Sequence, residues 1–410
     1  MPASPIESIR SIDAQALMEL FSTRPRLFAI GEPTHGAEAL LQLRNEVFRQ
    51  LVEGHDYRII ALESDCVLGV TVDDYVCSGI GSLDEVMENG FSHEWGLLAG
   101  NRALVQWMRE YNDGREASMR VRFAGFDGPL EMSAAASPRV SLCALHSYLA
   151  EWVNADLLPV TAETLDGLIG DDRQWTDPEA MMDPSKSIGR SAHAIDLRVL
   201  ADDLVDLLFS QAPDLRRKTT GPAWDRACLH GRTATGLLRY HYWMADDSAA
   251  RMARLCGLRD SMMAANLLAL TEKAPTLVYA HNSHLQRQRS RMQMWQGPIE
   301  WWCAGAVVSA ELNDDYGFVP TALGTMHHHD VGTPSPDTLE GLLYAMPGDR
   351  FLVDTHSLSA ALGDTLPNTR TSSWFGYAPI DPAQLAEFNG LLFVKDASRP
   401  TDESSFRSAR

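Results

Sequence analysis

Short, uninterrupted apolar runs alternate with amphipathic stretches along much of the 410-residue chain. A continuous apolar run, unlike one that alternates with polar residues, is typical of a parallel strand that is buried on both faces. Runs of this kind lie at residues 27–31, 57–63, 121–127 and 276–281. Apolar positions at helical spacing follow at residues 37–53 and 101–111. The alternation predicts an α/β fold with a mainly parallel sheet and helices on both faces.

The middle of the chain, residues 140–272, has a different pattern. Long helical stretches at residues 191–210, 222–244 and 248–270 follow one another without a strand-like run between them. We interpret this region as an inserted helical cap domain over the sheet. Strand-like runs return at residues 351–354 and 391–395. The predicted organisation is therefore an α/β core in two parts, 1–139 and 273–410, separated by the cap at 140–272. The polar tail after residue 400 is expected to be disordered.

Composition and charge restrict the partners. Asp and Glu outnumber Lys and Arg by 55 to 35, for a formal charge of −20. Such a field repels nucleic acid and anionic membranes. The sequence contains no apolar run of membrane-spanning length, no signal-peptide pattern and no C-x-x-C pair among its six cysteines. We expect a cytoplasmic protein that acts on a small molecule; the oligomeric state is not indicated.

All four predicted core strands end in ionisable residues. The runs finish as GEPTH, ALESD, GFDG and AHNSH. In an open parallel sheet, ligands bind outside the carboxyl ends of the strands, so these residues should converge on one crevice. One acid at a strand end usually only caps the next helix. Four ends with complementary chemistry favour a functional site made of Glu32, His35, Glu63, Asp127, His281 and His284.

The loop after the first strand suggests a general base. Pro33 fixes the backbone after Glu32, and Gly36 permits a tight turn into the next helix. If His35 stands at the start of the next helix, the positive end of the helix dipole keeps its imidazole neutral, as a base requires. In the alternative interpretation, Thr34 caps the helix and His35 is a bystander.

The chemistry of the cluster stays open at this stage. His281 and His284 are three residues apart, a spacing that also occurs in metal ligands. With Glu32 and Glu63 they could hold a divalent metal or form a metal-free acid–base cluster. We favour the metal-free site and expect no cofactor. The three histidines at 327–329 are expected in a solvated loop.

Several common enzyme signatures are absent from the sequence. It contains no G-x-S-x-G, S-x-x-K, H-E-x-x-H, Walker A or G-x-G-x-x-G motif. These absences argue against a common serine hydrolase, a zincin, a P-loop enzyme and a dinucleotide-dependent oxidoreductase. Water activated directly by an imidazole is the simplest remaining chemistry.

The motifs together resemble one known family. They are, in chain order, GEPTHG (31–36), Arg44, ALES (61–64), WMREYN (107–112), VRFAGFD (121–127), LRDSMMAANL (258–267) and YAHNSH (279–284). In this order the chain resembles the erythromycin esterase family from about residue 27 to 396. The resemblance implies an α/β core with a helical domain over the cleft, and hydrolysis of an ester or lactone by histidine-activated water without a serine nucleophile. It departs from the family at FNG (388–390), where an acidic residue would be expected.

The resemblance, together with the strand ends, gives a set of site residues. The predicted catalytic residues are His35, Glu63, His281, Glu32 and Arg44, and the predicted substrate-binding residues are His284, Asp127, Arg259 and Trp243. His35 would be the base, oriented by Glu63 or Glu32. His281 would be a second candidate base or the acid for the leaving alkoxide.

The role of Arg44 and the substrate-contacting aromatics are further predictions. Arg44 would stabilise the oxyanion, anchor the acids, or pair with Glu63 alone. Four aromatic side chains of the helical region would line an apolar wall, or else pack its helices together: Trp224, Tyr240, Tyr242 and Trp243.

Two other functions remain as alternatives. The same His/Glu site could serve a tailoring enzyme of a natural-product pathway that performs transesterification, deacylation or elimination. A non-catalytic ligand-binding protein would have lost the motif residues, which are present here.

Overall fold

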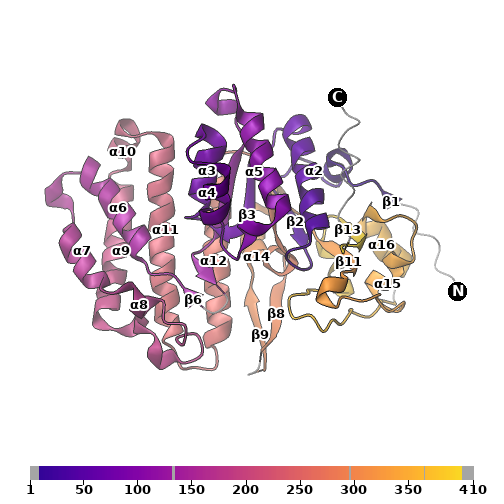
Figure 1. Cartoon of the computed structure of the whole chain (residues 1–410). Coiled ribbons are helices and arrows are strands. Elements are labelled where there is room, and N and C mark those ends of the chain that lie inside the picture. The colour runs from indigo at the N-terminus through magenta and orange to yellow at the C-terminus, as the bar shows by residue number, and fades with distance from the viewer. Residues whose placement is uncertain (1–8, 132–133, 295–296, 364, 399–410) are drawn as a thin grey trace.

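A five-stranded sheet forms the centre of the molecule (Figure 1). The computed structural model describes residues 9–131, 134–294, 297–363 and 365–398; the tail predicted to be disordered lies outside them. The strand order is β10-β2-β7-β3-β4, and each neighbouring pair is parallel. The strands are β2 (Leu27–Glu32), β3 (Ile59–Asp65), β4 (Arg122–Asp127), β7 (Thr276–His281) and β10 (Tyr316–Val319).

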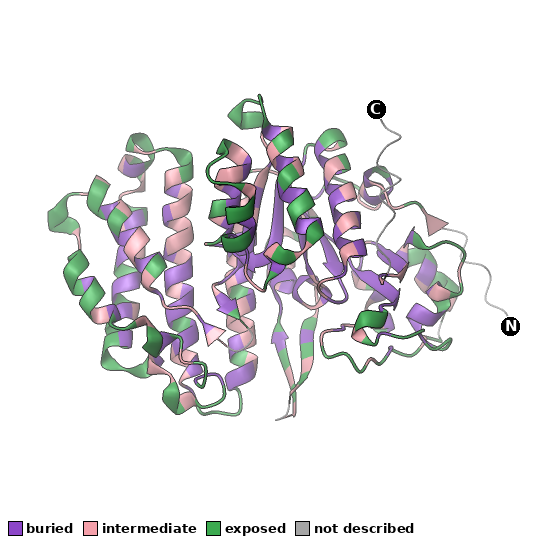
Figure 2. Cartoon of the chain, viewed as in Figure 1, coloured by how far each residue is buried: buried purple, intermediate pink, exposed green. Residues whose placement is uncertain are grey.

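Helices cover both faces of this sheet, as the sequence predicts. Alternate side chains of a strand point to opposite faces, so Phe28 and Ile30 of β2 join one hydrophobic cluster and Leu27 and Ala29 join another. The first cluster includes side chains of α2 (Glu38–Gly54), α3 (Gly69–Ser78), α4 (Leu83–Asn89) and α5 (Ala99–Asn112). The second includes α12 (Arg251–Thr271) and α14 (Ala304–Leu312). Figure 2 shows the strands between these helices as mostly buried.

A second, mixed sheet lies beside the first. Its order is β1-β12-β13-β11, with β11 and β13 parallel and the other two pairs antiparallel. Its elements are β1 (Ile9–Arg10), β11 (Thr321–Thr325), β12 (Arg350–Val353) and β13 (Leu391–Asp396), flanked by α1 (Ala14–Met18), α15 (Leu339–Tyr344) and α16 (Thr355–Leu362). Two antiparallel hairpins pair β5 (Leu130–Glu131) with β6 (Ala134–Ala135), and β8 (Arg289–Met294) with β9 (Gly297–Trp302).

The middle of the chain folds into helices with a hydrophobic cluster of their own. They form a bundle next to α3 and the β4 side of the main sheet (Figure 1). The bundle comprises α6 (Arg139–Trp152), α7 (Ala162–Ile169), α8 (Asp172–Trp175), α9 (Ala192–Ser210), α10 (Ala212–Lys218) and α11 (Gly221–Met244). The bundle lies beside the sheet. That it covers the carboxyl ends of the strands, as a cap domain would, remains a prediction.

Helix α12 joins the bundle to the sheet. Met252 and Leu255 in its first half pack in a cluster with Tyr240 of α11. Met263 and Leu267 in its second half belong to the second cluster on the main sheet, which also contains Leu27 and Ala29. The polar residues of α12 are therefore held in a fixed position between the helical bundle and the main sheet.

Within the described residues, none of the helices has the combination of length and hydropathy that crossing a bilayer would require. All six cysteines are described and are unpaired.

Candidate active site

The carboxylate of Glu63, near the end of β3, is the centre of the strand-end cluster. Glu63 is only 2% exposed. Its Oε1 lies 3.3 Å from Arg259 Nη2, 3.3 Å from His284 Nε2 and 3.8 Å from His35 Nε2. Its Oε2 accepts a hydrogen bond of 2.9 Å from the backbone N–H of His281. Burial alone would raise the pKa of this carboxyl, but His284, His35 and Arg259 outweigh burial and lower it far below its usual range.

The GEPTHG loop brings His35 to this carboxylate. A Cβ at Gly31 would lie 2.2 Å from Asn282 Oδ1, so only glycine fits where β2 meets α13 (Asn282–Leu285). Gly36 has the positive φ of +78° that the predicted tight turn requires. His35 Nδ1 then lies 2.6 Å from Glu32 Oε1. The His35 side chain is 40% exposed, so this imidazole is open to a substrate.

The helix-dipole argument for a neutral His35 is wrong. Helix α2 begins only at Glu38, and Ala37 occupies its N-cap position without a side-chain hydrogen bond. Thr34 is not the cap either, because its hydroxyl accepts a hydrogen bond of 3.0 Å from Trp374 Nε1. Burial lowers the pKa of His35, but Glu63 and the hydrogen bond with Glu32 outweigh it and raise the pKa above 6.5.

His281 lies beside His35, as the strand-end argument predicts. The two ring centroids are 5.1 Å apart, well within the roughly 12 Å over which a shared substrate and water could bridge them. His281 Nδ1 lies 2.6 Å from Ser283 Oγ, and its Nε2 lies 3.3 Å from the carbonyl oxygen of Gly376. Burial and the charge of His35 lower the pKa of His281 to about 3. His281 is therefore neutral at pH 7.

His284 is held between two carboxylates. Its Nδ1 lies 2.7 Å from Asp260 Oδ1, while its Nε2 faces Glu63. Asp260 is itself fixed by the indole N–H of Trp301 and by the backbone N–H of Ala304. Burial lowers the pKa of His284, but Asp260 and Glu63 raise it overall to about 9. His284 is thus a fixed positive charge behind Glu63.

Asp127 and Arg259, both predicted to bind substrate, are paired with each other. Arg259 Nε lies 3.1 Å from both carboxylate oxygens of Asp127, and its Nη2 lies 2.6 Å from Oδ2. The pair lowers the pKa of Asp127 and raises that of Arg259, in both cases against the effect of burial. Because Nη2 also reaches Glu63, the arginine joins the ends of β3 and β4.

Arg44 lies behind the site and not in it. The predicted pairing with Glu63 is wrong, because its guanidinium donates instead to Oδ1 of Asn45 and to Oδ1 of Asn101, at 2.7–3.0 Å. It also lies over the ring of Tyr279, 5.1 Å from the centroid. The Tyr279 hydroxyl donates to Glu32 Oε2 at 2.6 Å. Arg44 therefore supports Glu32 through Tyr279.

The four aromatics of the helical region pack mainly with their own surroundings. Trp224 and Tyr240 are 6% and 5% exposed and belong to hydrophobic clusters of the helices. Tyr242 contacts Trp243 edge-on, and Arg254 lies 3.8 Å from the centroid of the Trp243 ring. Among the described contacts, none joins these four side chains to His35 or His281. An apolar wall made by Trp243 therefore stays a prediction.

Sequence reasoning missed a fourth histidine, His93. It lies in the loop after α4, where both His93 and Glu94 have positive φ, at 57° and 59°. Its Nδ1 pairs with Glu131 and its Nε2 lies 3.6 Å from Asp127 Oδ2. Only the FSHEW run marks this loop, and it has neither periodicity nor a strand in front of it. The neighbouring Trp95 packs against His35, with ring centroids 5.2 Å apart.

Comparison with known proteins agrees with this arrangement. A family model described as erythromycin esterase matches residues 52–397. The chain belongs to the erythromycin esterase family. No curated protein matches it. Family membership indicates a hydrolase.

Three solved structures share the erythromycin esterase fold at low identity. A protein from Bacillus cereus is 17% identical with a TM-score of 0.69, covering 93% of this chain and 91% of that one. A succinoglycan biosynthesis protein is 16% identical with a TM-score of 0.70 and covers 96% and 92%. A mutant of the erythromycin esterase EreC in its open conformation is 18% identical with a TM-score of 0.66 and covers 93% of each chain.

The family match and the geometry complement each other. The matched region includes Glu63, Asp127, His281 and His284 but begins after the GEPTHG loop. His35 therefore joins the candidate active site through its contacts with Glu32, Glu63 and His281, and not through the family match. Among the described residues, no group of three or more His, Cys, Asp or Glu side chains is arranged to hold a metal ion. The histidines at 327–329 form a short exposed 3₁₀ turn, where His329 stacks on Trp374 with centroids 4.2 Å apart.

Proposed function

We propose that the protein hydrolyses a carboxylic ester or lactone with water activated by His35. The observation that carries this proposal is the bridge of His35 between two carboxylates, Glu32 at 2.6 Å and Glu63 at 3.8 Å, on a partly exposed imidazole. A general base needs this combination of access, orientation and a raised pKa.

The hydrogen bonds of His35 assign its reactive nitrogen. In the neutral ring, Nδ1–H donates to Glu32, which leaves the lone pair on Nε2. Nε2 then removes a proton from a water molecule, and the resulting hydroxide attacks the acyl carbon. The imidazolium forms between Glu32 and Glu63, whose charges stabilise it. The same imidazolium returns the proton to the leaving alkoxide, so the products are a carboxylic acid and an alcohol.

The neutral His281 is suited to hold the carbonyl oxygen of the substrate. If the Ser283 hydroxyl donates to Nδ1, the proton of His281 is on Nε2, which lies 3.3 Å from the Gly376 carbonyl. This N–H can turn to a substrate oxygen without carrying a charge, which suits a developing oxyanion. A pKa near 3 makes His281 a weak base. Its part in catalysis is accordingly that of a hydrogen-bond donor.

His284 and Arg259 keep Glu63 ionised. Both lie 3.3 Å from Glu63 Oε1. With these two cations behind it, the carboxylate remains negative and faces His35. The proposed mechanism requires no metal and no serine nucleophile.

A tailoring reaction is a second candidate. One structural neighbour carries the name of a biosynthesis protein. His35 is open enough to deprotonate an alcohol in place of water, which would transfer the acyl group to that alcohol. Hydrolysis and acyl transfer would use the same residues and would differ only in the acceptor of the acyl group, which is water or an alcohol.

A panel of simple esters and lactones, including a 14-membered macrolide, tests the proposal. Products are identified by mass spectrometry with and without an added alcohol. We expect free acid from at least one substrate, and its formation at least about a hundredfold slower with the His35→Asn variant. Acyl transfer to the alcohol in preference to water would favour the tailoring reaction. A purified, folded protein that converts no member of the panel would favour a ligand-binding role.

A further inference from the structure

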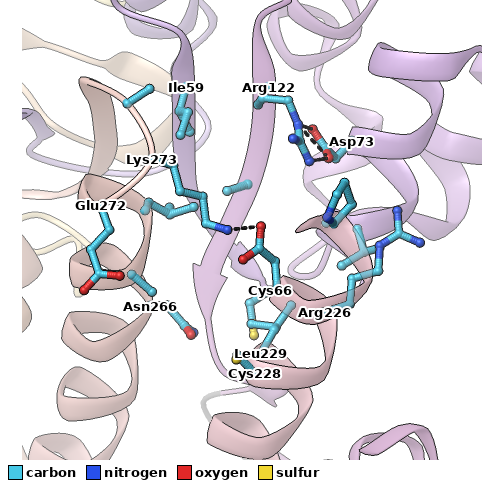
Figure 3. A pocket seen from close by; sticks show the side chains of 18 of the residues that line it. Ile59, Cys66, Asp73, Arg122, Arg226, Cys228, Leu229, Asn266, Glu272 and Lys273 are labelled. Atoms are coloured by element: carbon cyan, nitrogen blue, oxygen red, sulfur yellow. Dashed lines mark hydrogen bonds and ion pairs between the residues drawn. The ribbon is translucent and has the colours of Figure 1, made fainter. Parts of the chain in front are cut away.

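A cavity between the main sheet and the helices α11 and α12, shown from close by in Figure 3, is lined, within the described part of the chain, by none of the candidate active-site residues. Its volume is about 600 Å³, within the range of small-molecule sites. Ile59 and Arg122, the first residues of β3 and β4, lie on its wall, and the facing wall comes from α11 and α12.

The cavity is basic although the protein is acidic. Of the described residues on its wall, seven are Arg or Lys and three are Asp or Glu, while the whole chain carries a formal charge of −20. Two of the carboxylates are already paired. Asp73 pairs with Arg122, as the dashed lines in Figure 3 show, and Asp225 pairs with Lys273. Arg226 and Arg58 pair with Asp74 and Asp56, which lie outside the wall. Among the described residues, no carboxylate lies at ion-pair distance from the remaining three arginines of the wall, which are Arg120, Arg216 and Arg232.

Among these basic side chains, Arg232 is the one placed to bind an anion. Its Nε donates to Asn266 Oδ1 at 3.2 Å, and the amide of Asn266 is fixed in turn by the carbonyl oxygen of Phe126. Within the described part of the chain, no carboxylate lies at ion-pair distance from this guanidinium. Burial lowers the pKa of Arg232, while Asp225 and Glu272 act only from a distance. The terminal amino groups of a half-buried guanidinium are thus available to a planar anion.

Most of the remaining wall is apolar. Phe123 and Trp224 are buried, and Ile59 and Leu229 line the same space in Figure 3. A cavity with an arginine fork and apolar walls suits a molecule with one anionic group and an apolar body.

We propose that this cavity is a second binding site, for an organic carboxylate with an apolar chain or ring, held by Arg232. The site is separate from the His35 centre and independent of the reaction proposed there. A phosphate monoester offers the same anionic chemistry, so the test includes both head groups.

Calorimetric titration of the protein with octanoate, octyl phosphate and 1-octanol at pH 7 tests the proposal. We expect one octanoate or octyl phosphate per chain. 1-Octanol should bind at least about tenfold more weakly, because its neutral hydroxyl cannot form the charge-assisted hydrogen bonds that an anion forms with Arg232. The tighter of the two anions identifies the head group. If neither anion binds, or if 1-octanol binds as well, the proposal is wrong.

Variants locate the binding. Arg232→Gln should weaken the tighter anion at least about tenfold, whereas Arg173→Gln, which removes the same charge from an exposed side chain, should not. His35→Asn should leave binding unchanged. Binding lost with His35→Asn and kept with Arg232→Gln would place the anion in the strand-end site and overturn the assignment.

A measurement on the unmodified protein covers the case in which Arg232→Gln does not fold. Cys228 lines the cavity, and Cys143 of α6 does not. Octanoate should slow maleimide labelling of Cys228 relative to Cys143, as followed by mass spectrometry. Equal labelling of Cys228 with and without octanoate contradicts the proposal.

Discussion

At the scale of single residues, the site separates three histidines by their surroundings. His284 is held charged by two carboxylates, His281 is kept neutral by burial and a charged neighbour, and His35 alone combines exposure with a raised pKa. If His35 is the base, His35→Asn should lower kcat by at least about a hundredfold. KM should change little, because the imidazole acts on water. The exposed His193 provides the control His193→Asn; near-normal turnover of His35→Asn would remove His35 from the reaction.

Glu32 should set the pH dependence of the reaction. Its hydrogen bond and charge raise the pKa of His35, and a base works only when unprotonated. Activity should therefore fall as the pH decreases through a value above 6.5. In Glu32→Gln this acid limb should move to lower pH, because the pKa of His35 decreases. The pH profile of kcat/KM measures it, and an unmoved limb contradicts the role of Glu32.

The sequence could predict those site residues that lie at the carboxyl end of a strand. Glu32, Glu63, Asp127 and His281 are brought together because the strand ends share one edge of the sheet. Arg44 lies on a helix, and the helix period shows only that it is on a buried face, not which polar group it reaches. His93 lies in an irregular loop whose position depends on hydrogen bonds between Ser64 and Ser92. No local pattern encodes such a contact.

At the scale of elements, α13 is locked to α12 by the His284–Asp260 pair. A His whose folded pKa is raised contributes stability below its unfolded pKa and loses it as the pH rises through the folded value. His284 should thus lose its contribution between pH 6.5 and about 9. We expect the Tm to decrease over this range, and to decrease less in His284→Gln. An equal decrease in both proteins would show that this pair does not stabilise the fold.

Most long elements could be predicted from the sequence, whereas several short ones could not. β7 has the predicted bounds, and the long α11 differs from its predicted range by one residue. β10, of four residues, and the short β11 were not predicted, because runs of this length lack a distinct period. That β12 and β13 form a second sheet could not be predicted either, since pairing is a contact between distant segments.

At the scale of the whole molecule, segments that are distant in the sequence meet at a site that we propose to work without a metal ion. Chelator treatment followed by dialysis should leave turnover unchanged, and added divalent ions should not increase it. The reason is that His35 must accept a proton and His281 must donate a hydrogen bond, so neither can serve as a metal ligand. Thermal unfolding monitored in parallel is the control for damage by the chelator. Loss of turnover that one divalent ion restores would contradict the mechanism.

A single turnover in water enriched in ¹⁸O, with enzyme in excess over a substrate from the panel, tests whether water attacks the ester directly. Direct attack by His35-activated water predicts one solvent oxygen in the carboxylate of the first product, and a quenched protein of unchanged mass. A protein that gains the mass of the acyl group would show that an enzyme nucleophile attacks the ester, and a first product without the label would show that water does not attack the acyl carbon. Either result would contradict attack by His35-activated water.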